Sequence, residues 1–172
     1  MDKWHVKYLS ESNEQANVRV ALMKQLSASS PIFPEFQFVF ENNGITQYAR
    51  HIDAHNWPDD INLLRMLWGD FQTAIFDMHD HGYVHGDILK KNIVYDGTRL
   101  RLIDHELVLF HKNQLRATYP WIAPEDFIAK QLTSKTDLIC LKATALRLFD
   151  DVKYKEFRME QVLIISPFYS KF

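Results

Sequence analysis

The sequence His85-Gly86-Asp87-Ile88-Leu89-Lys90-Lys91-Asn92 decides how the rest of the chain is interpreted. It places an amide side chain, Asn92, five residues after the carboxylate of Asp87. A second carboxylate, Asp104, follows at the end of the next apolar run. Phosphoryl transfer uses such a set, because one carboxylate orients the attacking hydroxyl while an amide and a second carboxylate hold the metal ion on the phosphates. Phosphoryl transfer is therefore one chemistry that this set of side chains could serve, and the rest of the chain is considered with it in view.

Composition limits the class of protein. The chain has 172 residues, of which 47% are hydrophobic, enough for one globular domain with a core. A net charge of −2 gives no basic surplus, so we expect no nucleic-acid partner. The single cysteine, Cys140, excludes an internal disulfide. The N-terminus lacks the apolar core of a signal peptide and no apolar run is long enough to span a membrane, so we expect a cytoplasmic protein without a membrane partner.

The first part of the chain predicts a strand, a helix and a hairpin. Residues 4–9 alternate around β-formers, and Ser12-Asn13-Glu14-Gln15 then fits a capping box for a helix that runs to about residue 26. Residues 35–41 and 45–51 flank Asn43-Gly44, a strong hairpin turn. The apolar residues Val18, Ala21, Leu22 and Leu26 of this helix share one face with Glu14.

The rest of the chain predicts helices and one more hairpin. Asp59 or Asp60 caps a long helix that ends at Gly82, and Asp96-Gly97 joins two short strands. Further helices are expected from Pro124, over residues 138–148 and over residues 153–165. The long helix has a predicted buried stripe of Leu63, Leu64, Leu67, Phe71, Ile75 and Met78.

Four motifs, in this order, resemble the protein-kinase-like superfamily. The opening stretch resembles its catalytic loop, and Asp104 stands where that family has its DFG aspartate. Ala123-Pro124-Glu125 is similar to the APE motif, and Ser134-Lys135-Thr136-Asp137-Leu138 to the start of the αF helix. The resemblance covers most of the chain. With the order of elements it implies an α+β, two-lobed fold in a single domain, 1–172, with a reduced N-lobe (1–55) and a shortened helical C-lobe (56–172).

The resemblance also implies ATP and Mg²⁺ as cofactors and gives the residues their roles. Asp87 would position the acceptor hydroxyl, while Asn92 and Asp104 would hold Mg²⁺. Lys7, on the first strand, would bind phosphate and pair with Glu14 on the next helix.

Two further roles follow from the same resemblance. Lys90 or Lys91 would neutralise the transferring group, and Asp137 would brace the backbone of the catalytic loop. The intact APE motif favours a protein Ser/Thr substrate, although His-Gly-Asp also occurs in small-molecule and lipopolysaccharide-core kinases of the superfamily.

The departures from the family favour a second hypothesis. The sequence contains no Gly-x-Gly, and only six residues precede Lys7, where kinases have a glycine-rich loop. The DFG motif reads Asp104-His105-Glu106, and Gly86 replaces the arginine of the usual His-Arg-Asp. The alternative is therefore a pseudokinase that acts by binding a partner protein.

Two more groups of residues are open to other interpretations. His79, His81 and His85, with Asp80 or Asp87, have the composition of a metal site. Phe33, Phe36, Phe38 and Phe40 form an aromatic cluster, the last three on one face of a strand, that is either core or an exposed binding patch.

Overall fold

The computed structural model describes residues 3–9, 13–34, 36–42, 45–103, 124–129 and 132–148. In this part of the chain helices are combined with two small antiparallel sheets, so the fold class is α+β, as predicted. The turn at residues 43–44, Asp104, the loop at 106–119 and the helix expected over 153–165 lie outside the described residues.

The larger sheet has the strand order β1-β3-β2, with β1 over Lys3–Leu9, β2 over Phe36–Asn42 and β3 over Ile45–Ile52. β1 pairs with β3 along its whole length, and β2 and β3 form the predicted hairpin. The register between them shifts between Phe36 and Phe38. This irregularity interrupts the strict alternation on which the shared face of Phe36, Phe38 and Phe40 was predicted.

Helix α1 spans Asn13–Ser29 and is longer than predicted. Its last turn extends past residue 26 because Ser29 Oγ and Ser30 N both donate to the Leu26 carbonyl, at 3.1 and 3.0 Å. On the face that carries the apolar residues, Leu26 is buried and Ala21 is exposed, and Val20, which lies outside that set, is buried as well.

Helix α2 spans Ile61–Asp80, and Asp60 caps it by accepting hydrogen bonds from Asn62 N at 2.8 Å and Leu63 N at 3.3 Å. The chain leaves the helix through Gly82, whose φ of +79° is in the left-handed region. Both ends were predicted. The buried stripe includes Trp68, which stacks on Phe71, while Leu63 is only partly buried.

The remaining elements surround the predicted loop. The 3₁₀ turn η1 covers Lys90–Asn92 and leads into the hairpin of β4, Ile93–Tyr95, and β5, Leu100–Leu102. Helix α4 covers Pro124–Ala129, and α5 covers Ser134–Leu148. α5 begins four residues before the predicted start. The apolar pattern did not include its first turn, because that turn carries the polar Thr136 and Asp137, both of which are buried.

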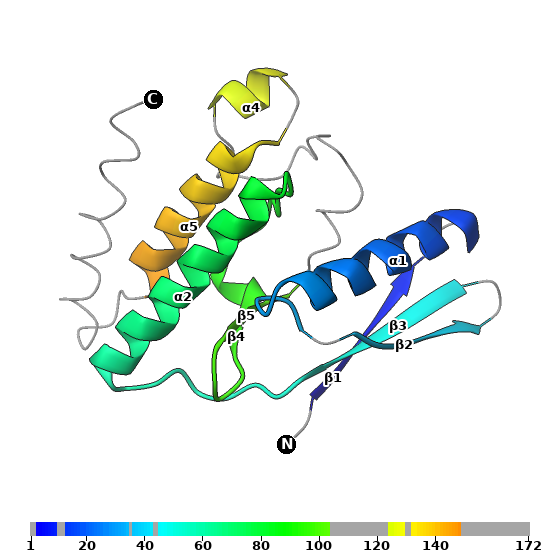
Figure 1. The fold of residues 1–172 in the computed structure, drawn as a ribbon, viewed down its shortest axis with the longest axis horizontal. Helices are drawn as coiled ribbons and strands as arrows, with labels where there is room; N and C mark the ends of the chain where they lie inside the picture. Colours follow the sequence, from blue (N-terminus) through cyan, green and yellow to red (C-terminus); the bar gives the residue numbers. More distant parts are fainter. Residues whose placement is uncertain are drawn as a thin grey trace.

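Figure 1 shows the three-stranded sheet and α1 together at one side, helices α2, α4 and α5 at the other, and the β4–β5 hairpin between them. The hairpin contacts both sides: Leu102 N donates to Ile32 O at 2.7 Å, and β5 packs on α2. None of the described helices is long and apolar enough to cross a bilayer. One hydrophobic cluster joins α1, α2, the hairpin and α5: Leu26, Ile32, Phe33, Leu64, Leu67, Trp68, Phe71, Ile75, Met78, Ile88, Ile93, Leu100, Leu102, Cys140, Leu141 and Ala145.

Candidate active site

The loop between α2 and β4 buries the polar side chains that the sequence singled out. His85, Asp87 and Asn92 are 0%, 6% and 1% exposed. Polar groups are rarely buried at this level unless they are hydrogen-bonded. The partners of these side chains therefore define the site.

Asp87 and Asn92 are held together by one amide group. Asn92 Nδ2 donates to both the carbonyl oxygen and Oδ2 of Asp87, each at 2.8 Å. The intervening backbone closes on itself, because Leu89 N donates to Asp87 O at 2.9 Å and Asn92 N donates to Leu89 O at 2.8 Å. The spacing of five residues is thus what brings the amide back onto the carboxylate.

This arrangement leaves oxygen atoms for a ligand. Asp87 Oδ1 is buried and has no hydrogen-bond partner among the described residues. Both described bonds of the Asn92 side chain use its nitrogen, so Oδ1 of the amide is not engaged by them. Mg²⁺ prefers oxygen ligands, and the amide oxygen of Asn92 fits that preference. Ile103 N donates to Asn92 O at 2.8 Å; Asp104, the next residue, lies outside the described part.

Asp137 of α5 holds the backbone of the loop in place through hydrogen bonds. Its Oδ2 accepts from His85 N at 2.7 Å and its Oδ1 from Gly86 N at 2.6 Å. His79 Nε2 at the end of α2 lies 2.9 Å from Oδ2 of the same carboxylate. Asp137 is fully buried, and these three contacts compensate its charge. The predicted brace is confirmed, and His79 adds a partner that was not predicted.

Two more residues of α5, Thr144 and Cys140, contact Ile88 of the loop. Thr144 Oγ1 donates to the carbonyl of Ile88 at 2.7 Å. Burial, and then the charges of Asp137 and Asp87, raise the pKa of the Cys140 thiol to about 12, although a hydrogen bond with the Ile88 backbone acts in the opposite direction. Cys140 therefore stays a thiol at neutral pH and is not a nucleophile.

Gly86 stands where the related motif has an arginine, and its backbone explains the difference. Its φ is +80°, which residues with a side chain rarely adopt. A Cβ at this position would lie 2.8 Å from Leu132 Cδ1, closer than side chains approach one another. Both facts favour glycine at this position whatever the chemistry of the site.

The structure brings Lys91, rather than Lys90, to the carboxylate. Lys91 Nζ lies 3.5 Å from Asp87 Oδ2, while most of the lysine side chain is exposed. Lys90 is also exposed, and the described ion pair of Asp87 is with Lys91. Sequence reasoning had left these two open.

Lys7 and Glu14 lie in the predicted elements. Lys7 is in β1, opposite Tyr48 of β3, and Glu14 is in the first turn of α1. The structure describes the backbone at both positions, and the pairing of their side chains stays a prediction.

Helix α4, which begins at Pro124 of the APE-like motif, is anchored by a residue that the sequence did not single out. Asp126 is buried and accepts hydrogen bonds from Thr133 N at 2.8 Å and Thr136 Oγ1 at 2.5 Å. Glu125, the motif residue, is exposed and lies 3.7 Å from Lys135 Nζ. The carboxylate of Asp126 therefore joins α4 to the start of α5.

The alternative metal site is not formed. His79 contacts Asp137, while exposed His81 donates from Nδ1 to the Asp77 carbonyl at 2.7 Å. The described residues contain no group of three or more His, Cys, Asp or Glu side chains that could hold a metal ion. His85 Nδ1 accepts from Asp87 N at 3.1 Å, so the three histidines have separate partners.

Known kinases resemble this chain in sequence and in fold. No model of a protein family matches the chain. Citron rho-interacting kinase of Rattus norvegicus is 25% identical over 148 residues, which cover 76% of this chain and 7% of that protein. The chain therefore corresponds to a small part of this relative.

A similarity in structure covers a larger share of this chain than the similarity in sequence does. The solved structure of the Cydia pomonella granulovirus kinase PK-1 superposes with a TM-score of 0.65 at 17% sequence identity. The match covers 86% of this chain and 60% of the viral kinase chain. The two comparisons support a protein-kinase-like relationship, and the fold of this chain is protein-kinase-like.

Proposed function

We propose that the chain is an ATP- and Mg²⁺-dependent phosphotransferase that acts on serine or threonine side chains of proteins. The observation that carries the proposal is the pair of Asp87 and Asn92, buried and hydrogen-bonded on a loop whose backbone is fixed by Asp137. Phosphoryl transfer depends on positioning and on electrostatic stabilisation, and this loop is rigidly positioned.

The oxygen atoms of Asp87 and Asn92 that these hydrogen bonds do not use define the proposed roles. Asp87 Oδ2 is engaged by Asn92, which orients Oδ1 for the hydrogen of an acceptor hydroxyl. Asn92 Oδ1 and the carboxylate of Asp104 would hold Mg²⁺. When bound, the metal ion neutralises charge on the phosphates. Lys91, 3.5 Å from Asp87, is better placed than Lys90 to stabilise the group in transfer.

The rest of the site is proposed from the arrangement of elements. Lys7 on β1 would contact phosphate and pair with Glu14 at the start of α1. We propose that the sheet and α1 form the smaller of two lobes, residues 1–55, and that residues 56–172 form the larger, helical one. A protein substrate is favoured by α4, which starts at Pro124 of the APE-like motif and is anchored on α5 by Asp126.

The proposal is tested by incubating the full chain with labelled ATP, Mg²⁺ and a cell lysate. We expect label transfer by the wild type and its loss in Asp87→Asn, with Mg²⁺·ATP binding kept, because Asp87 acts on the acceptor. Asp104→Ala should instead lose Mg²⁺-dependent binding. Asp80→Asn, an exposed carboxylate at the end of α2, is the matched control and should behave as wild type. Transfer that is unchanged in Asp87→Asn would contradict the assignment.

The second candidate is a pseudokinase that works by binding a partner protein. It is favoured by the sequence Asp104-His105-Glu106, which lacks the phenylalanine and glycine of the DFG motif. This candidate predicts no label transfer by the wild type, and a biological activity that survives Asp87→Asn. The same pair of proteins therefore distinguishes the two functions.

A further inference from the structure

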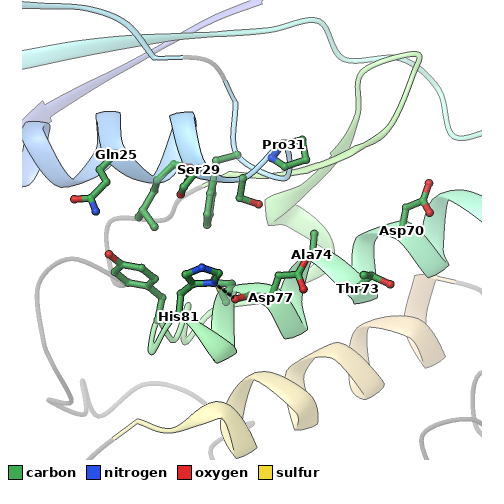
Figure 2. Close-up of a pocket in the computed structure, with 13 residues that line it drawn as sticks. Gln25, Ser29, Pro31, Asp70, Thr73, Ala74, Asp77 and His81 are labelled. Carbon is green, nitrogen blue, oxygen red and sulfur yellow. Dashed lines mark hydrogen bonds between the residues drawn. The ribbon is translucent and has the colours of Figure 1, made fainter.

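A cavity of about 420 Å³ opens between the end of α1 and the second half of α2. Figure 2 shows that α2 forms one wall and that Gln25, Ser29 and Pro31 lie on the opposite side. The α2 wall is a single helical face, since its residues follow the spacing of three and four that places side chains one above the other: Asp70, Thr73, Ala74, Asp77, Met78 and His81.

This cavity is separate from the proposed active site. His85, Asp87 and Asn92 are not among the described residues that line it. Its volume lies within the range of roughly 300–1,000 Å³ found for small-molecule sites. The cavity therefore has room for a ligand that the phosphotransfer reaction does not use.

One wall of the cavity is apolar. Leu26, Phe33 and Met78 line it and are at most 4% exposed. They belong to the hydrophobic core, so their positions are fixed by packing. A flat or branched apolar group could cover this wall and lose its contact with water.

Carboxylates are the prevailing charged groups among the described lining residues of the cavity. Asp70 and Asp77 are exposed carboxylates on its α2 wall, and none of the described lining residues is lysine or arginine. Arg101 is close by, since it donates to the carbonyls of Pro31 and Phe33, but its guanidinium is paired with Asp96. The ring of His81 is the remaining basic group, and its Nδ1 is engaged with the Asp77 carbonyl at 2.7 Å.

We propose that this cavity binds a small organic cation, an ammonium group on an apolar body. The apolar body would lie on Leu26, Phe33 and Met78, and the ammonium group would contact Asp77, which is next to Met78 in the sequence. Asp70 lies two helical turns away, roughly 10 Å along the axis, so a small amine contacts one carboxylate and feels the field of the other. The proposal does not depend on the function of the Asp87 loop.

The test is an NMR titration of the full chain with phenethylamine, phenethyl alcohol and hydrocinnamate, three probes of similar shape and different charge. We expect phenethylamine to shift the amide signals of the α2 wall and to bind at least about fivefold more tightly than the alcohol. Asp77→Asn should weaken binding of the amine about threefold or more, consistent with an exposed ion pair, and the double variant with Asp70→Asn should weaken it further.

Two controls make the result decisive. Asp80→Asn removes an exposed carboxylate of the same helix that does not line the cavity, and it should bind the amine as the wild type does. Ala74→Met should reduce binding of all probes, because its side chain extends into the cavity. Equal binding of amine and alcohol, no effect of the Asp70 and Asp77 changes, or shifts confined to the Asp87 loop would each overturn the proposal.

Discussion

At the scale of single residues, the loop depends on two glycines with nearly the same backbone and different surroundings. Gly82 and Gly86 have φ of +79° and +80°. A Cβ on Gly82 would meet nothing within 4 Å, whereas one on Gly86 would lie 2.8 Å from Leu132 Cδ1. The two positions therefore separate the cost of backbone conformation from the cost of a steric clash.

We predict that Gly82→Ala lowers the free energy of unfolding by about 1–2 kcal/mol, the cost of a left-handed residue with a side chain. Gly86→Ala should cost about 1–3 kcal/mol more, because it also overpacks the contact with Leu132. Urea unfolding measures both changes. Leu132→Ala should recover part of the difference in the Gly86→Ala background, and equal losses in the two alanine variants would contradict the clash.

A second residue-scale feature is the charge of Asp96 in the turn between β4 and β5. Its Oδ1 accepts from Thr98 N, Thr98 Oγ1 and Arg99 N, and its Oδ2 from Arg101 Nε. Burial raises the pKa of this carboxyl, but the hydrogen bonds, that of Arg101 first, outweigh it and lower the pKa from 3.8 to about 2. The folded state thus favours the charged form.

We predict that Asp96→Asn lowers the free energy of unfolding by about 1–3 kcal/mol at neutral pH, because the donors of Thr98, Arg99 and Arg101 lose a charged acceptor. A lowered pKa stabilises the fold above the ordinary value of 3.8, and this stabilisation is lost as the pH falls towards 2. Urea unfolding of both proteins between pH 7 and 2 measures the difference. A difference that does not narrow below pH 4 would show that the charge is not its source.

Sequence spacing could predict Asp87 and Asn92 because their contact is local. It could not predict Thr144, since the carbonyl that it binds is 56 residues away. The same is true of His79, which meets Asp137 across 58 residues. One signal was available: Asp137 and Thr144 lie two helical turns apart, so these two polar side chains share one face of the helix.

At the scale of elements, α5 acts as the support of the loop. One face of this helix presents Asp137 to two backbone N–H groups and Thr144 to a backbone carbonyl. The loop has little regular structure of its own, so these bonds replace a ladder of neighbouring strands. This also explains why the apolar pattern alone placed the start of the helix too late.

We predict that Thr144→Val, which keeps the shape of the side chain, lowers the free energy of unfolding by about 1–3 kcal/mol, because the buried carbonyl of Ile88 loses its donor. The amide of Leu89, which closes the loop on Asp87, should also exchange its hydrogen faster. Thr144→Ser keeps the hydroxyl and should restore slow exchange. Unchanged exchange in the valine variant would show that the hydroxyl does not hold the loop.

The elements themselves were predictable where a local signal sets them. The Asp60 cap and Gly82 fix the ends of α2, and both are read from neighbouring residues. The end of α1 was misplaced because Ser29 and Ser30 bond to the Leu26 carbonyl instead of breaking the helix. Trp68 was missed although it lies four residues after Leu64 and three before Phe71, so the helical spacing of the stripe includes it.

At the scale of the whole molecule, the sheet with α1 and the group of α2 and α5 are joined through the β4–β5 hairpin (Figure 1). Residues 31–33, which follow α1, lie along β5. Leu102 N donates to Ile32 O at 2.7 Å, and Arg101 Nη1 donates to Pro31 O at 2.6 Å and to Phe33 O at 3.3 Å. The fold class followed from the order of elements, but this join could not, because its partners are about 70 residues apart.

We predict that Arg101→Met, which keeps an apolar stem but removes the guanidinium, lowers the free energy of unfolding by about 1–3 kcal/mol, since two backbone carbonyls and Asp96 lose a charged donor. The effect should concentrate at the join, so the Leu102 amide should exchange faster relative to amides in the middle of α2. Hydrogen exchange followed by NMR measures both sites in one sample. Arg99→Met, an exposed arginine of the same hairpin, is the matched control and should leave the exchange of Leu102 unchanged. If Arg101→Met and Arg99→Met exchange alike at Leu102, the guanidinium does not hold the two parts together, and the join depends on the buried contacts of Ile32 and Leu102 alone.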